Sequence, residues 1–289
     1  MHAPYVWLIT GASGGFGKCL VNSVLARGDR VIATARSLEK MGDLPKTDSI
    51  RLLQLDVTAG AAALTGIMAE AVAFWGRIDV LVNNAGYGAK ALVEEAGSAE
   101  MRVQYETNVF GTLDVTTAVL PYMRAERSGT IVMIGSRTSW RPELTSTGLY
   151  ASSKAALRVF SETLAVELEP FAIRMLIVEP AAFRTDALIR KSVYTDNPIP
   201  DYNAMRDAAI QRYKDMHRAL RGDPAKAMEA VTDVVRGEGA AAGKQWPLYL
   251  ILGDLGVKGV AEKCDRVLHL LEEWKEVSTG LDIDPEEDC

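Results

Sequence analysis

The stretch Thr10-Gly11-Ala12-Ser13-Gly14-Gly15-Phe16-Gly17 decides the fold of this chain. It follows an apolar run at 5–9 and precedes apolar residues at helical spacing, so it predicts a strand, a tight turn and a helix. Glycines let the backbone approach a ligand closely, and a helix N-terminus offers unpaired N–H groups to a phosphate. The stretch therefore predicts a dinucleotide cradle. Its glycine spacing differs from the G-x-G-x-x-G fingerprint, so a plain glycine-rich turn is the alternative.

Short apolar runs alternate with longer helical patterns beyond this stretch. The runs lie at 6–10, 30–35, 50–55, 80–83, 130–134, 175–178 and 248–252, and the helical patterns at 18–27, 61–75, 99–124, 151–168 and 260–275. This alternation predicts an α/β fold, a Rossmann-type doubly wound parallel sheet of about seven strands with helices on both faces. No linker-like segment divides it, so residues 1–289 are expected to form a single domain.

The segment 186–223 interrupts the alternation. It is polar, lacks strand pattern and carries Pro198 and Pro200. A long excursion of this kind often covers a site, so we expect a substrate lid that is mobile without ligand and ordered with it.

Composition excludes several classes of function. The chain of 289 residues has a net charge of −6 and scattered basic residues, which argues against nucleic-acid binding. Its three cysteines are far apart, so neither a disulfide framework nor a metal site is expected. No apolar stretch approaches the roughly 18 residues of a membrane span, and the first strand begins too early for a cleavable signal. A cytoplasmic protein is the expectation.

Polar residues follow the predicted strands where ligands bind in doubly wound sheets. Arg36 comes directly after the second run, where an acidic residue would bind the adenosine ribose of NAD and repel a 2′-phosphate. An arginine accommodates that phosphate, so Arg36 favours NADP(H) over NAD(H), with an ordinary solvated arginine as the alternative. Asp56 follows the third run and Asn83-Asn84-Ala85-Gly86 the fourth. Taken alone, Asp56 also fits a helix N-cap, and the Asn-Asn-Ala-Gly stretch also fits a plain turn.

Tyr150 and Lys154 are four residues apart at the start of a helical pattern, so they share one helix face. The ammonium is expected to lower the pKa of Tyr150 from its reference of about 10, which would give a proton donor usable near neutral pH. Ser136 follows the fifth run, at the edge where a hydroxyl can bond a substrate oxygen. Without that context Ser136 fits a turn or a cap.

In this order and spacing, the motifs resemble those of the short-chain dehydrogenase/reductase superfamily over nearly the whole chain. They are residues 10–17, Asp56-Val57, Asn83 to Gly86, Asn108 within Asn-Val-Phe-Gly, Ser136, Tyr150-xxx-Lys154, Glu179-Pro180 and Thr185. Within the superfamily, Ala33-Thr34-Ala35-Arg36, Val178-Glu179-Pro180 and Glu273-Trp274 are most similar to the 17-beta-hydroxysteroid-dehydrogenase-like branch. That branch covers many substrates, so its name is not a steroid assignment.

The resemblance implies an enzyme that transfers a hydride between a nicotinamide and a carbonyl carbon. Tyr150 is implied as the acid in reduction and the base in oxidation, and Lys154 as the group that lowers its pKa and binds the nicotinamide ribose. Ser136 is implied to polarise the substrate oxygen, and Asn108 to position a water beside Lys154. The implied NADP(H) contacts are Thr10, Gly11, Ser13, Gly15, Phe16 and Gly17 at the pyrophosphate and adenosine ribose, Asp56 and Val57 at the adenine, Asn83 and Gly86 at the centre, and Thr185 at the carboxamide.

Two positions depart from the superfamily pattern. Ala181 stands where glycine is usual after Pro180, and we expect its methyl to tighten the backbone beside the nicotinamide. Gly135 replaces a frequent serine, and the interval from Ser136 to Tyr150 is about one residue longer than is common. Ser139 is therefore the alternative substrate-binding hydroxyl.

The expected substrate is an uncharged, fairly hydrophobic ketone, aldehyde or secondary alcohol. Its expected pocket is mostly apolar or aromatic, walled by Tyr87, Trp140, Pro142, Leu144 and Phe183 together with parts of the lid. Two other functions fit the resemblance: an isomerase, dehydratase or epimerase on the same fold, and a regulatory module that binds NADP(H) without catalysis. A homodimer through the helices at 99–124 and 151–168 is implied by resemblance only.

Overall fold

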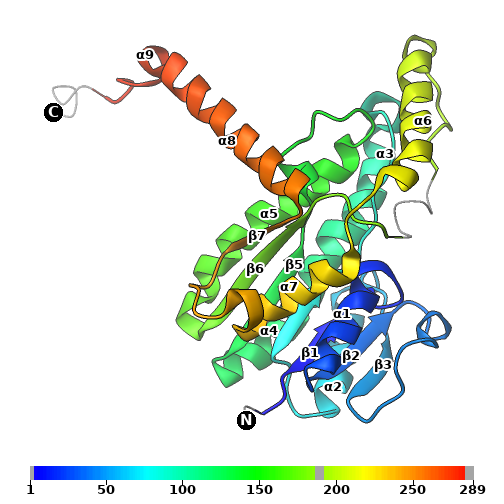
Figure 1. Ribbon diagram of the computed structural model, residues 1–289, viewed down its shortest axis with the longest axis vertical. Coiled ribbons are helices and arrows are strands. Elements are labelled where there is room, and N and C mark those ends of the chain that lie inside the picture. The colour runs from blue at the N-terminus through cyan, green and yellow to red at the C-terminus, as the bar shows by residue number, and fades with distance from the viewer. Residues whose placement is uncertain (1–2, 186–191, 284–289) are drawn as a thin grey trace.

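Seven parallel strands form one sheet in the order β3-β2-β1-β4-β5-β6-β7 (Figure 1). The computed structural model describes residues 3–185 and 192–283. Chain order runs outward in both directions from the β1/β4 boundary, which is the switch point where doubly wound sheets bind ligands. The expected sheet is confirmed, with strands β1 (Val6–Ile9), β2 (Arg30–Ala35), β3 (Ile50–Gln54), β4 (Val80–Asn83), β5 (Gly129–Ile134), β6 (Ile173–Pro180) and β7 (Tyr249–Leu252).

Helices cover both faces of the sheet because the central strands β1, β4 and β5 are buried on both sides. In β1, Trp7 and Ile9 belong to one core cluster, which α1 (Gly15–Ala26) and α7 (Pro224–Arg236) complete. Val6 and Leu8 point the other way, into a second cluster. That cluster is completed by the helices α2 (Ala61–Ala73), α4 (Gly111–Glu126) and α5 (Gly148–Leu168).

The helix expected at 99–124 is not continuous. It consists of α3 (Val93–Tyr105), a π-helical turn η2 (Glu106–Phe110) and α4. Such turns occur often at functional sites, and this one contains Asn108. Short 3₁₀ turns complete this list of elements: η1 (Glu39–Met41), η3 (Arg137–Ser139), η4 (Glu169–Phe171), η6 (Pro200–Tyr202) and η7 (Gly239–Ala241).

The excursion between β6 and α7 is helical where the sequence indicated only a polar segment. Its main element is α6 (Asn203–Ala219), and residues 186–191 of the expected lid lie outside the described part of the chain. The two ends of the excursion meet, since the Arg184 N–H donates to the Gly222 carbonyl at 2.9 Å. A Cβ at Gly222 would lie 2.7 Å from the Phe183 ring, so this closure requires glycine.

Polar contacts fix the excursion against α3. The buried Glu95 carboxylate forms an ion pair with Arg206 of α6 and accepts the Ile199 N–H at 3.0 Å. Arg212 donates to the Thr145 carbonyl, so α6 also contacts the loop after η3. The excursion therefore bridges two segments that flank the carboxyl end of the sheet.

The C-terminal helix α8 (Asp254–Glu273) leaves the body as an arm and is followed by α9 (Lys275–Ser278) (Figure 1). Every residue from 264 to 283 is exposed. In the described ranges, no helix has both the length and the apolar character needed to cross a bilayer.

Candidate active site

The glycine-rich turn after β1 is held by β4. The Thr10 hydroxyl accepts the N–H groups of Asn84 and Ala85, each at 2.9 Å, and the Asn84 side-chain amide donates to the Thr10 and Gly11 carbonyls. A Cβ at Gly17 would lie 2.3 Å from the Gly11 carbonyl oxygen, and Gly11 has a positive φ of 67°. These positions accept only glycine, so the turn is rigid and its backbone is open to a ligand.

The N-terminus of α1 fits an anion. The helix starts at Gly15 with no side-chain cap and no acidic residue in its first turn, so its first N–H groups remain available to a phosphate. Thr185 lies beside this turn, 3.6 Å from the position of a Cβ at Gly15. Phe16 packs edge-on against Phe183, with ring centroids 5.5 Å apart. The structure thus brings Thr185 to the glycine turn.

The residues expected around the adenosine lie at the ends of β2 and β3. Arg36 is exposed, and its carbonyl accepts the Gln54 side-chain amide at 3.0 Å. Asp56 accepts the N–H and hydroxyl of Thr58, so its carboxylate closes a turn. The N-cap of α2 is Gly60, so the helix-cap alternative for Asp56 is wrong. Val57 is buried, and its carbonyl would lie 2.7 Å from a Cβ at Gly111.

Asn83 bonds neighbouring side chains, whereas Asn108 mainly holds backbone. Asn83 donates to Thr116 of α4 at 2.9 Å, away from the glycine turn. Asn108 is fully buried; it accepts the Tyr87 N–H and donates to the Tyr87 carbonyl and to Ser153. A Cβ at Gly86 would lie 3.0 Å from Asn108 Oδ1 and 3.6 Å from Lys154 Nζ, so the two side chains meet at Gly86.

Ser136, Tyr150 and Lys154 meet at the carboxyl end of β5. Tyr150 and Ser136 are linked by a hydrogen bond, and the Ser136 hydroxyl also accepts from Thr138 at 2.9 Å. Lys154 donates to the Ile134 carbonyl at 2.6 Å, and its Nζ lies 5.9 Å from the centre of the Tyr150 ring. The structure therefore brings the three expected residues together.

The expected direction of the Tyr150 pKa is wrong. Burial is the main cause that raises the pKa of Tyr150 to about 12; the Ser136 hydrogen bond lowers it and the nearby Glu179 carboxylate raises it. Burial also lowers the pKa of Lys154 to about 8, against the attraction of Glu179. Helical spacing indicated the proximity of the two groups and gave no measure of their desolvation.

Glu179 is a buried carboxylate at the same site, and sequence reasoning gave it no role. It accepts the Ser136 N–H at 2.6 Å and the Ser139 hydroxyl at 3.3 Å. Burial raises its pKa to about 7, although the Ser136 N–H and the charges of Lys154 and Arg158 lower it. Glycine at 135 is explained by this group, because a Cβ there would lie 2.8–2.9 Å from its carboxylate atoms.

Two residues expected to wall the substrate pocket, Trp140 and Leu144, have different surroundings. The Arg158 guanidinium lies over the Trp140 ring at 4.3 Å, and Tyr249 meets Trp140 edge-on with ring centroids 5.9 Å apart, while Leu144 is exposed. The Ala181 methyl faces Gly253 and Gly256 at the start of α8, at 3.4 Å from a Cβ built at either glycine. The extra methyl is therefore accommodated by the end of β7 and the start of α8.

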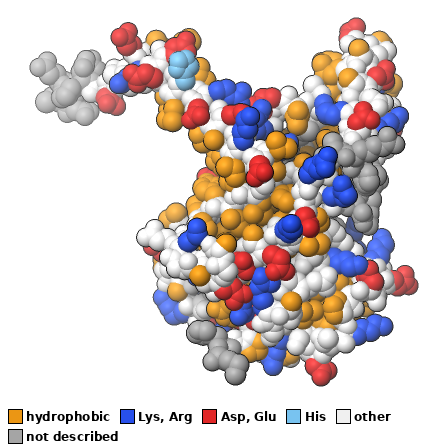
Figure 2. All heavy atoms as spheres, viewed as in Figure 1, with side chains coloured by type: hydrophobic (Ala, Val, Ile, Leu, Met, Phe, Trp, Pro, Cys, Tyr) orange, Lys and Arg blue, Asp and Glu red, His pale blue; other side chains and the backbone are white. Residues whose placement is uncertain are grey.

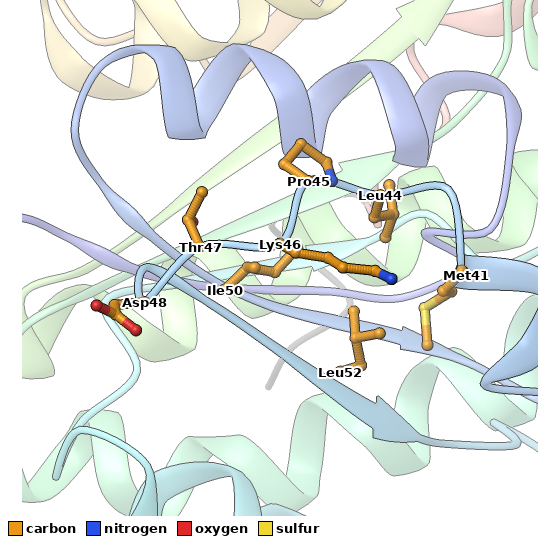
Figure 3. Close-up of a pocket in the computed structure, with 9 residues that line it drawn as sticks. Met41, Leu44, Pro45, Lys46, Thr47, Asp48, Ile50 and Leu52 are labelled. Carbon is orange, nitrogen blue, oxygen red and sulfur yellow. The ribbon is translucent and has the colours of Figure 1, made fainter.

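Two surface hollows lie away from this cluster. One, of about 570 Å³, lies between η1 and β3, and Figure 3 shows the Lys46 side chain extending there toward Met41 and Leu52. The other, of about 490 Å³, lies beside Trp246 and α7. Neither hollow is lined by Tyr150. The candidate site is therefore identified by the polar residues around Tyr150 and not by the size of a hollow. No group of three potential metal ligands occurs within the ranges 3–185 and 192–283.

Comparison with known families agrees with this site. The model of the family described as short chain dehydrogenase matches residues 5–194. The chain belongs to this family. The match spans the sheet from β1 to β6, the glycine turn and the Ser136, Tyr150 and Lys154 group.

Known relatives cover almost the entire chain. Oxidoreductase BOA17 of Botryotinia fuckeliana is 31% identical over 280 residues, covering 94% of this chain and 97% of that protein. The crystal structure of a short-chain dehydrogenase from Streptomyces avermitilis has 37% identity and a TM-score of 0.84, covering 97% of this chain and 100% of its own. The closed form of a serine dehydrogenase complexed with NADP+ has 28% identity and a TM-score of 0.67, covering 85% and 94%. The chain is therefore a short-chain dehydrogenase/reductase oxidoreductase in fold and family.

Proposed function

We propose that this short-chain dehydrogenase interconverts a carbonyl and an alcohol on a fairly hydrophobic small molecule, using NADP(H). The observation that carries the proposal is the assembly of Ser136, Tyr150 and Lys154 beside a glycine turn that only glycines can form. A binding module would need the turn alone. A buried phenol hydrogen-bonded to a serine serves proton transfer.

In carbonyl reduction, Tyr150 donates its proton to the substrate oxygen. With a pKa near 12 the phenol is fully protonated at neutral pH, and the alkoxide that forms is a stronger base than the phenolate. The Ser136 hydroxyl donates to the same oxygen and stabilises its developing charge. The nicotinamide, when bound, supplies the hydride. Lys154 then stabilises the phenolate, because its ammonium lies close to the Tyr150 ring.

Ser136 is preferred over Ser139 as the substrate hydroxyl. Ser136 is hydrogen-bonded to Tyr150, whereas Ser139 donates to Glu179. Ser139 and Glu179 together hold the backbone of Ser136, since Glu179 accepts the Ser136 N–H. We assign Ser139 and Glu179 as positioning residues and Asn108 as the holder of the 86–87 backbone.

NADP(H) is preferred over NAD(H) because Arg36 ends β2, and charge-assisted hydrogen bonds from a guanidinium suit a 2′-phosphate. The serine dehydrogenase that resembles this chain was solved with NADP+, which supports the same choice. The residues of the glycine turn, Asp56, Val57, Asn83, Gly86 and Thr185 are assigned to the same cofactor.

The segment 186–223 is proposed as the lid, with its two ends held together at Phe183 and Gly222. The contacts of α6 with α3 and with the 145–146 loop support α6 as the part of the lid that would cover a substrate. Amide hydrogen exchange of α6 should slow when cofactor and substrate are both bound. If amide exchange in α6 does not change, α6 is a fixed part of the protein surface and not a lid.

Three finer assignments also stay proposals. The 17-beta-hydroxysteroid-dehydrogenase-like branch rests on the motifs at 33–36 and 178–180. A homodimer through α4 and α5 is supported by two exposed valines of α5, Val159 and Val166. The cytoplasm is proposed from the unpaired cysteine pattern.

The function is tested by NADPH oxidation against a panel of uncharged ketones and aldehydes, with NADH beside it. We expect turnover of apolar carbonyl compounds and a preference for NADPH. Tight NADPH binding without turnover of any compound in either direction would favour the regulatory module, and product formation without net NADPH oxidation would favour an isomerase.

A further inference from the structure

The C-terminal arm carries an apolar stripe that the described part of the chain leaves exposed. Figure 2 shows apolar side chains along the projecting arm. Eight of them are 42–79% exposed: Val267, Leu268, Leu270, Leu271, Trp274, Val277, Leu281 and Ile283. We propose that this arm stripe pairs with the same stripe of a second copy of the chain, with the two α8 helices antiparallel.

The spacing of the stripe fits a helix pair. Along α8 its central positions recur at alternating intervals of three and four residues, which is the seam of a two-stranded coil: Val257, Val260, Cys264, Val267 and Leu271, with Trp274 at the end of the helix. Leu268 and Leu270 flank this seam. The stripe therefore runs along α8 from the base of the arm to Trp274.

The exposed area matches what a dimer needs. At roughly 100 Å² per side chain, the eight exposed residues present on the order of 800 Å² per copy, which equals one partner's share of a standard interface. A twofold axis places the same patch on both partners, so one stripe is sufficient for a closed pair.

Charge disfavours an anionic lipid surface as the partner. The described arm, 254–283, carries seven acidic and four basic residues, and this negative balance is repelled by anionic headgroups. The base of the arm is fixed to the body by ion pairs of Arg141 with Glu262 and of Arg266 with Glu143. The arm therefore has a set direction and cannot lay its stripe on its own sheet without breaking both pairs.

Charge also selects the antiparallel direction. In the antiparallel register that aligns the two seams, Cys264 faces Trp274 of the other copy and Val267 faces Leu271. The small Cys264 side chain therefore lies opposite Trp274, the largest side chain of the stripe. Lys263 then lies on the same side as Glu273 of the second helix, and Lys275 on the same side as Asp265. In a parallel pair the two lysines would face Leu268 and Leu270, without an acidic partner.

Disulfide formation tests this register in the full-length chain. Trp274→Cys, in a chain that also carries Cys289→Ser, should form a covalent dimer through Cys264 on mild oxidation, because the two positions share one layer of the pair. The matched control Glu276→Cys lies two residues away on the opposite face of the arm and should stay uncrosslinked. Absence of the dimer in Trp274→Cys, or equal crosslinking of both variants, would overturn the proposal.

A second measurement does not depend on cysteine chemistry. Amide exchange in residues 264–278 should be slow at high protein concentration, should quicken on dilution, and should be fast at all concentrations in Leu271→Arg. Protection that is independent of dilution would show the arm folded on its own body. Sedimentation of the wild type, and not of Leu271→Arg, with phosphatidylglycerol vesicles would assign the stripe to a lipid surface; either result contradicts the pairing.

Discussion

The carboxyl end of β5 and the C-terminal arm break the usual distribution of polar and apolar residues in opposite ways. At β5 and β6 the structure buries Lys154, Asn108 and Glu179, which are groups that water normally solvates. On the arm it exposes Leu271 and Trp274, which are groups that proteins normally bury. Each departure costs free energy unless something else contacts the residues.

The two regions differ in where their unusual residues find contacts. Glu179 and Lys154 are held by Ser136, Ser139 and the Ile134 carbonyl, so these buried groups find their partners within one chain. The base of the arm is paired with the body through Glu262 and Arg266, but from 267 to 283, where the description of the arm ends, no residue forms a hydrogen bond or ion pair with the body. Substitutions near β5 should therefore change catalysis, and substitutions on the arm should change association between copies. Each set should have little effect on the other property.

The largest expected effect is at Lys154. Lys154→Met keeps a long apolar chain and removes the ammonium, so kcat should fall by about 10²- to 10⁴-fold and NADPH affinity should fall with it. Steady-state kinetics and calorimetric titration measure the two losses. Lys46→Met, at the hollow beside β3, is the matched control and should behave as wild type. Normal turnover in Lys154→Met would contradict the assigned site.

Glu179→Gln tests the buried carboxylate through pH. The pKa of Glu179 is about 7 in the folded protein, above its ordinary value of 4.5, so the folded protein binds the carboxyl proton more tightly than the unfolded chain does. This proton binding stabilises the fold fully below about pH 4.5, and the stabilisation is lost as the pH rises through 7. At 1.36 kcal/mol per pKa unit the loss is about 3 kcal/mol.

Urea unfolding at pH 5 and pH 8 measures this effect. The Gln variant should lose less stability than wild type over that interval, since its amide does not ionise. Glu126→Gln, at an exposed carboxylate, is the control and should follow wild type. An identical pH dependence in wild type and Glu179→Gln would show that Glu179 is not the titrating group.

Arg36→Ala tests the cofactor side. It should weaken NADPH binding by about 1.5–3 kcal/mol, the range for hydrogen bonds to charged groups, and leave NADH binding almost unchanged. Calorimetric titration with both cofactors measures the difference. An equal loss for the two would remove the 2′-phosphate assignment.

The smallest effect on folding is expected at the arm. Leu271 is exposed, so Leu271→Arg should change the free energy of unfolding by no more than about 0.5 kcal/mol at a concentration where arms are separate. Denaturant unfolding of the dilute protein checks this. A loss of several kcal/mol would mean that Leu271 packs inside its own chain.

The sheet could be predicted from the sequence because its strands are short apolar runs between turn residues. Two helices were missed, α6 and α7, although α7 had a start signal: Asp223 accepts the N–H groups of Ala225 and Lys226, and Pro224 occupies its first turn. The polar composition of 186–223 concealed α6, which is fixed by Glu95, about a hundred residues earlier in the chain.

The candidate site was predicted only where local spacing decides proximity. Tyr150 and Lys154 lie on adjacent turns of one helix, so their distance follows from the sequence. Their pKa values do not, because burial depends on β5, β6 and the 86–88 backbone packed around them. Glu179 was visible as a carboxylate in an apolar run, but its partner, the Ser136 N–H, is 43 residues away.

The central claim, that Tyr150 donates the proton, is tested most directly by Tyr150→Phe. This change keeps the ring and removes the hydroxyl, so kcat for NADPH-dependent carbonyl reduction should fall by at least about 10²- to 10⁴-fold while NADPH affinity stays close to that of wild type. Turnover of Tyr150→Phe equal to that of wild type, on any carbonyl compound that wild type reduces, would contradict the account.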